Sequence, residues 1–305
     1  MSIIFFGTPE FAVPSLKALI EACEDITLVV TQPDRAKGRG HKLLPAPLKV
    51  TAKEMGIQVI EPLTLKDDDL ILRLSEIRPE FIIVVAYGKI LPRRILDIPL
   101  RGCINLHASL LPKYRGAAPI QWALINGEEI TGVTTMLMDE GLDTGPVFLK
   151  QELIIDEDDN AESLSRRLSE IGASLLLETV RGIRNGSLKP KPQEGEPSFA
   201  PPLKKEDGYI DWNKTAREIF NLIRGTYPWP GAHCFIGGER VRIIKARPLN
   251  SEGQPGIIEK VTKDELLIGT GKGLLSVLEL QPSGRSQMSI RDFLQGRRLT
   301  QGSAL

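Results

Sequence analysis

The chain has 305 residues, of which 41% are hydrophobic and 26% charged, and its formal net charge is zero. This composition is typical of a globular protein with room for one large domain and a smaller one. Its three cysteines, Cys23, Cys103 and Cys234, are far apart, so neither a disulfide framework nor a zinc site is expected. Because no apolar run approaches the roughly 18 residues of a membrane span, we expect a cytoplasmic protein without membrane contact.

Strand and helix signals alternate along residues 1–150. Short apolar, β-branched runs, which are typical of buried parallel strands, lie at Ile3–Phe6, Ile26–Val30, Gln58–Ile60, Phe81–Val85 and Cys103–Leu106. Amphipathic stretches that predict helices lie at Pro14–Ala22, Pro47–Met55, Asp68–Ile77 and Ala117–Asn126. This alternation predicts an α/β domain with a doubly wound, mainly parallel, Rossmann-like sheet.

The turn after the first strand argues against a dinucleotide site. A dinucleotide-binding protein would have Gly-x-Gly-x-x-Gly at this point, whereas here only Gly7 of those glycines is present. NAD binding is therefore not expected. Ligands of open parallel sheets bind beyond the carboxyl ends of the strands, where the segment Ala86–Lys89 and the residues Asn105 and His107 fall.

The connection after the second strand, residues 31–42, is long and basic. Strand-to-helix connections usually take about 2–6 residues, and this one is about twice that length with one acidic residue, Asp34. Its basic residues are Arg35, Lys37, Arg39 and Lys42. We interpret it as a mobile loop that binds a phosphate backbone. The alternative is an ordinary solvated surface loop.

Three polar side chains fall where such sheets keep their chemistry. Asn105 and His107 are two residues apart at the end of a predicted strand, so their side chains share a face. Asp143 lies in a glycine-punctuated loop after the apolar run Val133–Met138. A histidine that moves a proton, a carboxylate that orients it and an amide that binds a developing oxyanion are suited to acyl transfer. The alternative is a core asparagine, a satisfied histidine and a solvated turn aspartate.

The second half of the chain differs in composition. Residues 160–185 predict a long helix, and the proline-rich stretch after Gly186 predicts an extended linker. A short helix is predicted at Thr215–Arg224. Several strand-like runs then predict a small antiparallel, OB-like β-barrel: Val241–Lys245, Gly256–Val261, Leu266–Gly269 and Leu274–Leu280.

These signals divide the chain into a catalytic domain (residues 1–188), a linker (189–205) and a C-terminal barrel (206–305). Residues 1–188 carry 21 Lys and Arg against 26 Asp and Glu, and residues 189–305 carry 18 against 13. The basic second part indicates a polyanionic partner.

The motifs together resemble the folate-dependent formyltransferase family. Asn105-x-His107 is followed by the turn Ser109-Leu110-Leu111-Pro112 and then by Asp143-Thr144-Gly145. Further segments similar to that family are Gly7–Phe11, Gln32–Arg35, Val85–Gly88, Tyr114–Ile120 and Trp229-Pro230. The resemblance covers both domains, which favours the branch of the family that acts on methionyl-tRNA over one-domain relatives that act on small amines.

The resemblance implies that a formyl group moves from 10-formyltetrahydrofolate to the methionine amino group of charged initiator tRNA for translation initiation. It implies that Asn105 and protonated His107 bind the formyl oxygen and that Asp143 holds His107. No covalent intermediate is required, because neither Cys103 nor Ser109 has an evident activating base, and no metal is expected, because the three histidines are far apart. It places the folate against Tyr87, Gly88, Ile90, Leu91, Ser109, Leu110, Leu111, Pro112, Met138 and Glu140. It assigns tRNA contacts to Arg35, Lys37, Arg39, Lys42, Lys204, Lys205, Arg240, Arg242, Lys245 and Arg247.

Two other interpretations remain open. A formyltransferase for an amino sugar, or the folate-hydrolase module of a larger dehydrogenase, keeps the chemistry but has little use for a basic loop and a basic barrel. A non-catalytic RNA-binding protein with a degenerate enzyme domain fits the basic half, yet it predicts loss of at least one of Asn105, His107 and Asp143. We expect a monomer, because the sequence shows no long exposed apolar stripe.

Overall fold

A computed structural model describes residues 2–37 and 42–305, without the side chains of residues 35–37, 42 and 43. Its contacts form two compact units. The first comprises Met1–Pro119, Ile130–Ile154 and Ser165–Ala200, and the second Ile120–Glu129, Ile155–Leu164 and Pro201–Leu305. Residues 189–200, expected to belong to a linker, thus have their contacts within the first unit. The three predicted domain ranges themselves stay a prediction.

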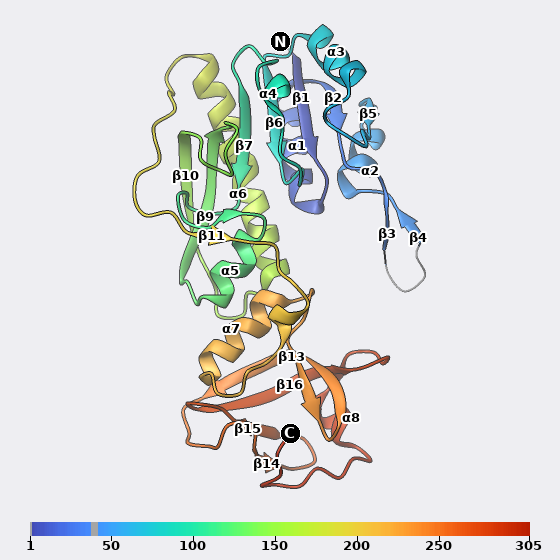
Figure 1. The fold of residues 1–305 in the computed structure, drawn as a ribbon, viewed down its shortest axis with the longest axis vertical. Coiled ribbons are helices and arrows are strands. Elements are labelled where there is room, and N and C mark those ends of the chain that lie inside the picture. Colours follow the sequence, from blue (N-terminus) through green and yellow to red (C-terminus); the bar gives the residue numbers. More distant parts are fainter. Residues whose placement is uncertain (1, 38–41) are drawn as a thin grey trace. The chain divides into compact units, whose positions relative to one another are not determined.

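The first unit is built on a seven-stranded sheet with the order β10-β9-β7-β6-β1-β2-β5 (Figure 1). Its strands are β1 (Ser2–Gly7), β2 (Asp25–Val30), β5 (Val59–Ile60), β6 (Phe81–Val85), β7 (Cys103–His107), β9 (Ile130–Leu137) and β10 (Val147–Ile154). The five strands from β7 to β5 are parallel to one another. The strand β9 is antiparallel to both of its neighbours, β7 and β10. The predicted doubly wound, mainly parallel sheet is confirmed.

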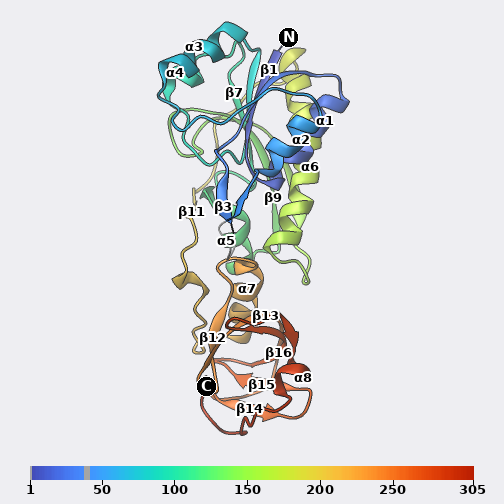
Figure 2. The ribbon, with the colours of Figure 1, turned by 90° about the vertical axis from the view of Figure 1, so that its right-hand side faces the viewer.

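Helices cover both faces of this sheet, with α3 and α4 on one side and α1, α2 and α6 on the other (Figure 2). Their bounds are α1 (Val13–Glu21), α2 (Pro47–Glu54), α3 (Asp68–Ile77), α4 (Arg93–Leu96) and α6 (Ala161–Arg184), and η1 (Glu10–Ala12) precedes α1. The helix α5 (Pro119–Ile125) belongs to the second unit except for its first residue. Gly172 lets α6 lie close to β7, because a Cβ there would stand 2.8 Å from Leu106 Cδ2. Cys103 packs in a core with Ile95 of α4. Since side chains alternate along β7, Asn105 and His107 lie on the sheet face opposite to α6.

Local sequence explains why α3 has its predicted bounds. The Asp67 carboxylate caps the helix by accepting a hydrogen bond from the Asp69 amide, and the acidic first turn complements the helix dipole. Arg78 ends the helix in the left-handed conformation. The strand β10 was not among the predicted elements. β10 is an edge strand whose burial pattern is mostly exposed, so it lacks the apolar run that marked the inner strands.

The basic connection also differs from the expected loop, because it contains a two-stranded antiparallel hairpin of β3 (Arg35–Lys37) and β4 (Lys42–Leu44). Ion pairs hold its base. Lys49 Nζ lies 2.6 Å from Asp34 Oδ2 and 2.7 Å from Glu61 Oε2. Hydrogen bonding to Lys49 lowers the pKa of the Asp34 carboxyl.

A charged network lies at the amino ends of the parallel strands, away from Asn105 and His107. Arg184 of α6 pairs with Glu24 at 2.9 Å and with Glu80 at 2.8 Å, and Arg101 pairs with Glu80 at 2.9 Å. The Glu80 side chain is 2% exposed. Hydrogen bonds to the two carboxylates raise the pKa of Arg184. The network therefore holds the end of α6 against the sheet.

The second unit is built on an antiparallel sheet with the order β12-β13-β16-β15-β14, and β17 pairs with β16 (Figure 1). Its elements are η2 (Glu206–Gly208), α7 (Ala216–Thr226), β12 (His233–Ile236), β13 (Glu239–Leu249), β14 (Ile258–Val261), β15 (Leu266–Gly269), β16 (Leu274–Pro282), β17 (Met288–Ser289) and α8 (Ile290–Leu294). A capping box between Thr215 and Glu218 begins α7. This half-barrel confirms the predicted class of the C-terminal domain.

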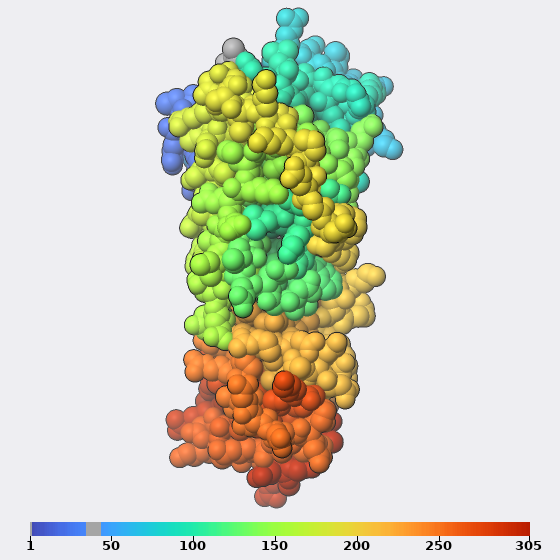
Figure 3. All heavy atoms as spheres, turned by 90° about the vertical axis from the view of Figure 1, so that its left-hand side faces the viewer, coloured from blue at the N-terminus to red at the C-terminus, as the bar shows by residue number. Residues whose placement is uncertain are grey.

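The first unit also contains a separate pair of short strands. β8 (Arg115–Gly116) pairs in parallel with β11 (Phe199–Ala200). In Figure 3 the segment that leads to β11 is a yellow strip of atoms over the first unit. Among the described residues, none of the helices combines the length and apolarity that crossing a membrane requires.

Candidate active site

His107 is the last residue of β7, and both of its ring nitrogens face polar atoms. Its side chain is 7% exposed. Nε2 lies 2.9 Å from the Tyr114 carbonyl oxygen; because a carbonyl only accepts, Nε2 carries a proton. Nδ1 lies 3.7 Å from Oδ2 of Asp143, which is beyond a hydrogen bond but close enough for strong attraction to a protonated ring. Nδ1 is thus the nitrogen left to exchange a proton.

The loop that carries Asp143 is closed by its own hydrogen bonds. Asp143 Oδ2 accepts a hydrogen bond of 2.8 Å from the Gly116 amide, and its backbone is left-handed with φ of 52°. Asp139 Oδ1 accepts hydrogen bonds from Gly141 N at 3.0 Å and Thr144 Oγ1 at 2.7 Å. These contacts fix the carboxylate of Asp143 opposite His107.

Asn105 shares a strand face with His107 and has an unusual side chain. Its Oδ1 is buried and has no hydrogen-bond partner among the described residues. A buried acceptor without a partner costs about 1–3 kcal/mol, so a site of this kind is retained where a bound molecule supplies the donor. The structure thus brings His107 and Asp143 together and leaves the amide of Asn105 free on the same face.

The turn after β7 is rigid. Ser109 is buried, and its hydroxyl donates to the Lys113 carbonyl at 2.6 Å. Thr134 of β9 links both ends of the turn: its hydroxyl donates to the Ser109 carbonyl at 2.7 Å and accepts from Leu111 N at 3.2 Å. Leu111 is 0% exposed, and Pro112 is also buried, whereas Leu110 is partly exposed. The turn offers a fixed wall rather than free polar groups.

The segment after β6 divides into buried and exposed residues. The Tyr87 ring is 1% exposed and packs edge-on against Phe6 at 5.1 Å between ring centroids. Its burial raises the pKa of the Tyr87 hydroxyl to about 12. Leu91 is 2% exposed, whereas Ile90 is 73% exposed and Gly88 is also exposed. Any contact of Tyr87 or Leu91 with a ligand would therefore be through the backbone.

The two other folate candidates lie at the start of the Asp143 loop. Met138 is half-buried and packs at the edge of the same core as the Tyr87 ring. Glu140 is exposed. Both border the loop that holds Asp143.

Sequence reasoning missed three groups that the geometry assigns to the site: the Tyr114 carbonyl, the Gly116 amide and the side chain of Gln193. Gly116 has φ of 124°, and a Cβ there would stand 2.6 Å from the Ala200 carbonyl oxygen. The segment from Tyr114 carried a family resemblance, which was a usable signal. Gln193 lies in the supposed linker and had no local signal.

The predicted tRNA contacts fall on several elements. The side chains of Arg35, Lys37 and Lys42, and the whole of Arg39, lie outside the described residues. Lys204 and Lys205 are exposed just before η2. On β13 the apolar residues Val241, Ile243 and Ala246 are buried. The four basic residues alternate with them and lie on the other face: Arg240, Arg242, Lys245 and Arg247.

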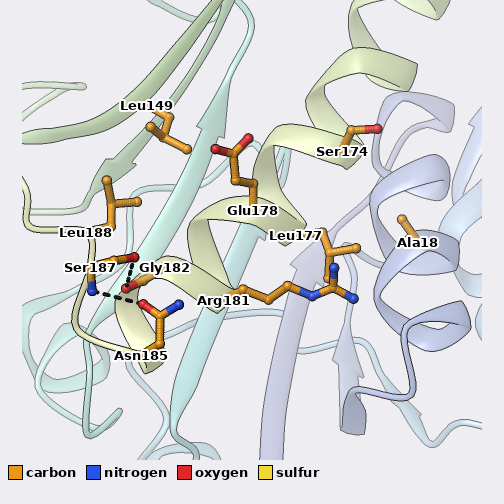
Figure 4. Close-up of a pocket in the computed structure, with 10 residues that line it drawn as sticks. All are labelled: Ala18, Leu149, Ser174, Leu177, Glu178, Arg181, Gly182, Asn185, Ser187 and Leu188. Atoms are coloured by element: carbon orange, nitrogen blue, oxygen red, sulfur yellow. Dashed lines mark hydrogen bonds between the residues drawn. The ribbon is translucent and has the colours of Figure 1, made fainter.

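The cavities described next lie away from His107. The first, of about 390 Å³, lies on the α6 face of the sheet and is lined by Leu177, Glu178 and Arg181 among others (Figure 4). The second, of about 520 Å³, is in the second unit and includes Lys245 and Arg247 in its lining. Within residues 2–37 and 42–305 no group of three or more His, Cys, Asp or Glu side chains could hold a metal ion.

Comparisons with known proteins identify the family of the chain. The family described as "Formyl transferase" matches residues 1–180, and "Formyl transferase, C-terminal domain" matches residues 202–298. The methionyl-tRNA formyltransferase of Thermodesulfovibrio yellowstonii is 59% identical over 98% of this chain and 97% of its own. That of Geobacter metallireducens is 49% identical over 100% of this chain and 98% of its own.

Solved structures show the same fold. A methionyl-tRNA formyltransferase from Clostridium thermocellum has a TM-score of 0.58 and 21% identity, covering 81% of this chain and 93% of its own. A sugar 3N-formyl transferase, solved with dTDP and 5-N-formyl-THF, has a TM-score of 0.69 and 22% identity, covering 94% and 99%. Because two family matches and relatives of 49–59% identity span nearly the whole chain, the chain belongs to the formyl transferase family, and within it to the methionyl-tRNA formyltransferases.

Proposed function

We infer that the protein transfers a formyl group from 10-formyltetrahydrofolate to the methionine amino group of charged initiator tRNA. The product is formylmethionyl-tRNA, which serves translation initiation. One observation carries this function: the unpartnered amide oxygen of Asn105 is on the same face of β7 as His107, which is paired with Asp143. The match to relatives of that name over nearly the whole chain supports the same acceptor.

The oxygen of the formyl group gains negative charge when the amine attacks, and the site has donors for it. We assign the Asn105 amide nitrogen as one donor. His107 is the other. Its Nε2 is bonded to the Tyr114 carbonyl, so the protonated ring donates through Nδ1. Asp143, 3.7 Å from that nitrogen, stabilises the charged ring. The folate supplies the activated formyl group and leaves with a proton on its nitrogen.

Proton movement is the second task of the pair. The attacking amine must lose a proton and the departing nitrogen must gain one, so the same groups accept and return it. The Asp143 carboxylate and Nδ1 of His107 face each other and suit this exchange. The incoming amine donates a hydrogen bond to the buried Oδ1 of Asn105. This oxygen then has the hydrogen-bond partner that it otherwise lacks.

The folate lies, in this proposal, against the fixed turn Ser109–Pro112, the exposed Gly88 and Ile90, and the start of the loop at Met138 and Glu140. A flat ring needs such walls and a few backbone groups rather than free charges. The backbones at Tyr87 and Leu91 complete the wall.

Basic surfaces on both parts of the chain would bind the tRNA. We propose residues 1–188 as the catalytic domain, 189–205 as the linker, and 206–305 as the tRNA-binding half-barrel. The basic face of β13 suits phosphate contact. Because charged tRNA and ribosomes are cytoplasmic, the proposal places the protein there, and it acts as a monomer.

A competition assay tests the acceptor. The protein is mixed with 10-formyltetrahydrofolate and with either charged initiator tRNA or a dTDP-linked amino sugar, and the formylated product is identified. We expect formylmethionyl-tRNA alone. Formylation of the sugar, with the tRNA unmodified, would overturn the proposal.

Salt dependence tests the basic hairpin. Neutralising Lys37, Arg39 and Lys42 together should weaken tRNA binding and flatten its dependence on salt, because each phosphate contact released contributes to the slope. An unaltered slope would place the tRNA elsewhere.

A further inference from the structure

Residues 191–200, which we call the strap, bind along the first unit. Lys191 and Val147 exchange two backbone hydrogen bonds, of 2.7 and 2.8 Å. Near its other end the Ser198 carbonyl accepts from Arg115 N at 2.8 Å. Figure 3 shows this yellow segment lying over the surface of that unit. The strap is therefore part of the unit that holds the candidate active site.

Gln193 of the strap contacts the loop of Asp143 through its side chain. Its Nε2 donates to the carbonyl oxygens of Asp143 and Gly145, each at 2.8 Å. Its Oε1 accepts from Arg115 Nε at 3.2 Å and from the terminal nitrogen Nη2 at 2.7 Å. Both amide hydrogens and the amide oxygen are used, and among side chains of this length only a carboxamide can do this.

The strap also holds the residue that fixes His107. Ser198 Oγ accepts a hydrogen bond of 2.9 Å from Tyr114 N. The carbonyl of the same Tyr114 accepts from His107 Nε2. Tyr114 and Asp143 both have left-handed backbones, with φ of 58° and 52°, a conformation that other contacts must maintain. One segment thus supports both sides of the gap between the imidazole and the carboxylate.

We propose that Gln193 is a positioning residue for formyl transfer. It holds the Asp143 peptide so that the carboxylate stays opposite Nδ1 of His107, and it acts through that carboxylate alone. This rests on the proposed function for the roles of Asp143 and His107. Because small displacements of reacting groups lower rates steeply, loss of the two donated bonds should lower kcat by about 10- to 100-fold. The KM values for folate and tRNA should change little.

Two substitutions separate the contacts of Gln193. Gln193→Glu keeps an acceptor for Arg115, and an ionised carboxylate donates nothing to the carbonyls of Asp143 and Gly145. Gln193→Met keeps the length and loses all the hydrogen bonds. The matched control is Gln151→Glu, at an exposed position of β10 in the same unit. We expect both Gln193 variants to lose kcat and the Gln151 variant to keep it.

A double-mutant cycle distinguishes positioning from a general structural role. In an Asp143→Asn background the charge that Gln193 positions is already absent, so adding Gln193→Met should lower kcat by less than about twofold. A full, additive loss in that background would overturn the proposal, as would kcat values of both single variants equal to that of the unchanged protein. If Asp143→Asn alone leaves kcat unchanged, the proposed function of Asp143 fails instead. Thermal unfolding of each variant confirms that the folded protein is compared.

Discussion

Replacing Asp143 by asparagine isolates the electrostatic contribution of the site. Asparagine keeps an oxygen for the Gly116 amide and tolerates the left-handed backbone. What is lost is a negative charge 3.7 Å from Nδ1 of His107. Two unit charges at about 4 Å attract by about 1 kcal/mol in water and about 4 kcal/mol at an effective dielectric constant of about 20. The side chains are 7% and 14% exposed, which favours the larger value.

The expected consequence is a fall in kcat of about 100- to 1,000-fold, since each 1.4 kcal/mol or so is a factor of ten in rate. Single-turnover formylation of charged tRNA measures it, with KM for each substrate determined separately. Asp139→Asn is the matched control, because Asp139 is a carboxylate of the same loop that accepts bonds from Gly141 and Thr144. An Asp143→Asn enzyme as fast as the control would refute the electrostatic role.

Three further predictions concern catalysis, stability and thiol chemistry. Asn105→Ala should lower kcat by about 10²–10³-fold while folate binding persists in an equilibrium titration; unchanged turnover would remove Asn105 from the chemistry. Glu80→Ala leaves two arginines without their buried partner and should lower the free energy of unfolding in urea by about 3 kcal/mol, whereas Glu76→Ala, at an exposed position of α3, should change it by less than about 0.5 kcal/mol. Equal effects would contradict the network. Burial raises the pKa of the Cys103 thiol from 9.0 to about 12, so the folded state favours the neutral thiol, and its stabilising contribution is present below pH 9.0 and lost as the pH rises towards 12. A thiol reagent at pH 8 should accordingly label the exposed Cys23 and spare Cys103 in the folded protein. Mass spectrometry measures the labelling, and labelling of Cys103 with Cys23 spared would contradict the prediction.

In the sheet of the first unit, strands that are buried on both faces could be predicted from local composition. Phe81–Val85 is one unbroken apolar run, and all five residues are buried in β6. β10 gave no such signal, because only one of its eight residues, Val147, is buried. The hairpin of β3 and β4 was missed for a similar reason, since a short pair of strands rich in charge has the composition of a loop.

The residues of the candidate site that stand at the end of a strand could be predicted from the sequence. Asn105 and His107 were found because strand periodicity places them on one face. The support around them was not, because it comes from distant segments. Nothing local to Gln193 indicates that it lies 2.8 Å from the carbonyl of Asp143, 50 residues earlier in the chain.

By itself, the sequence determined which residue types stand at the ends of which strands, because apolar periodicity and turn residues are local properties. Tertiary structure alone decided that Nε2 of His107 is bonded to the Tyr114 carbonyl, that Nδ1 faces Asp143 across 3.7 Å, and that the strap supports both. The physical reason is that hydrogen bonds depend on distance and direction in space, and chain folding sets both for residues that are far apart in sequence.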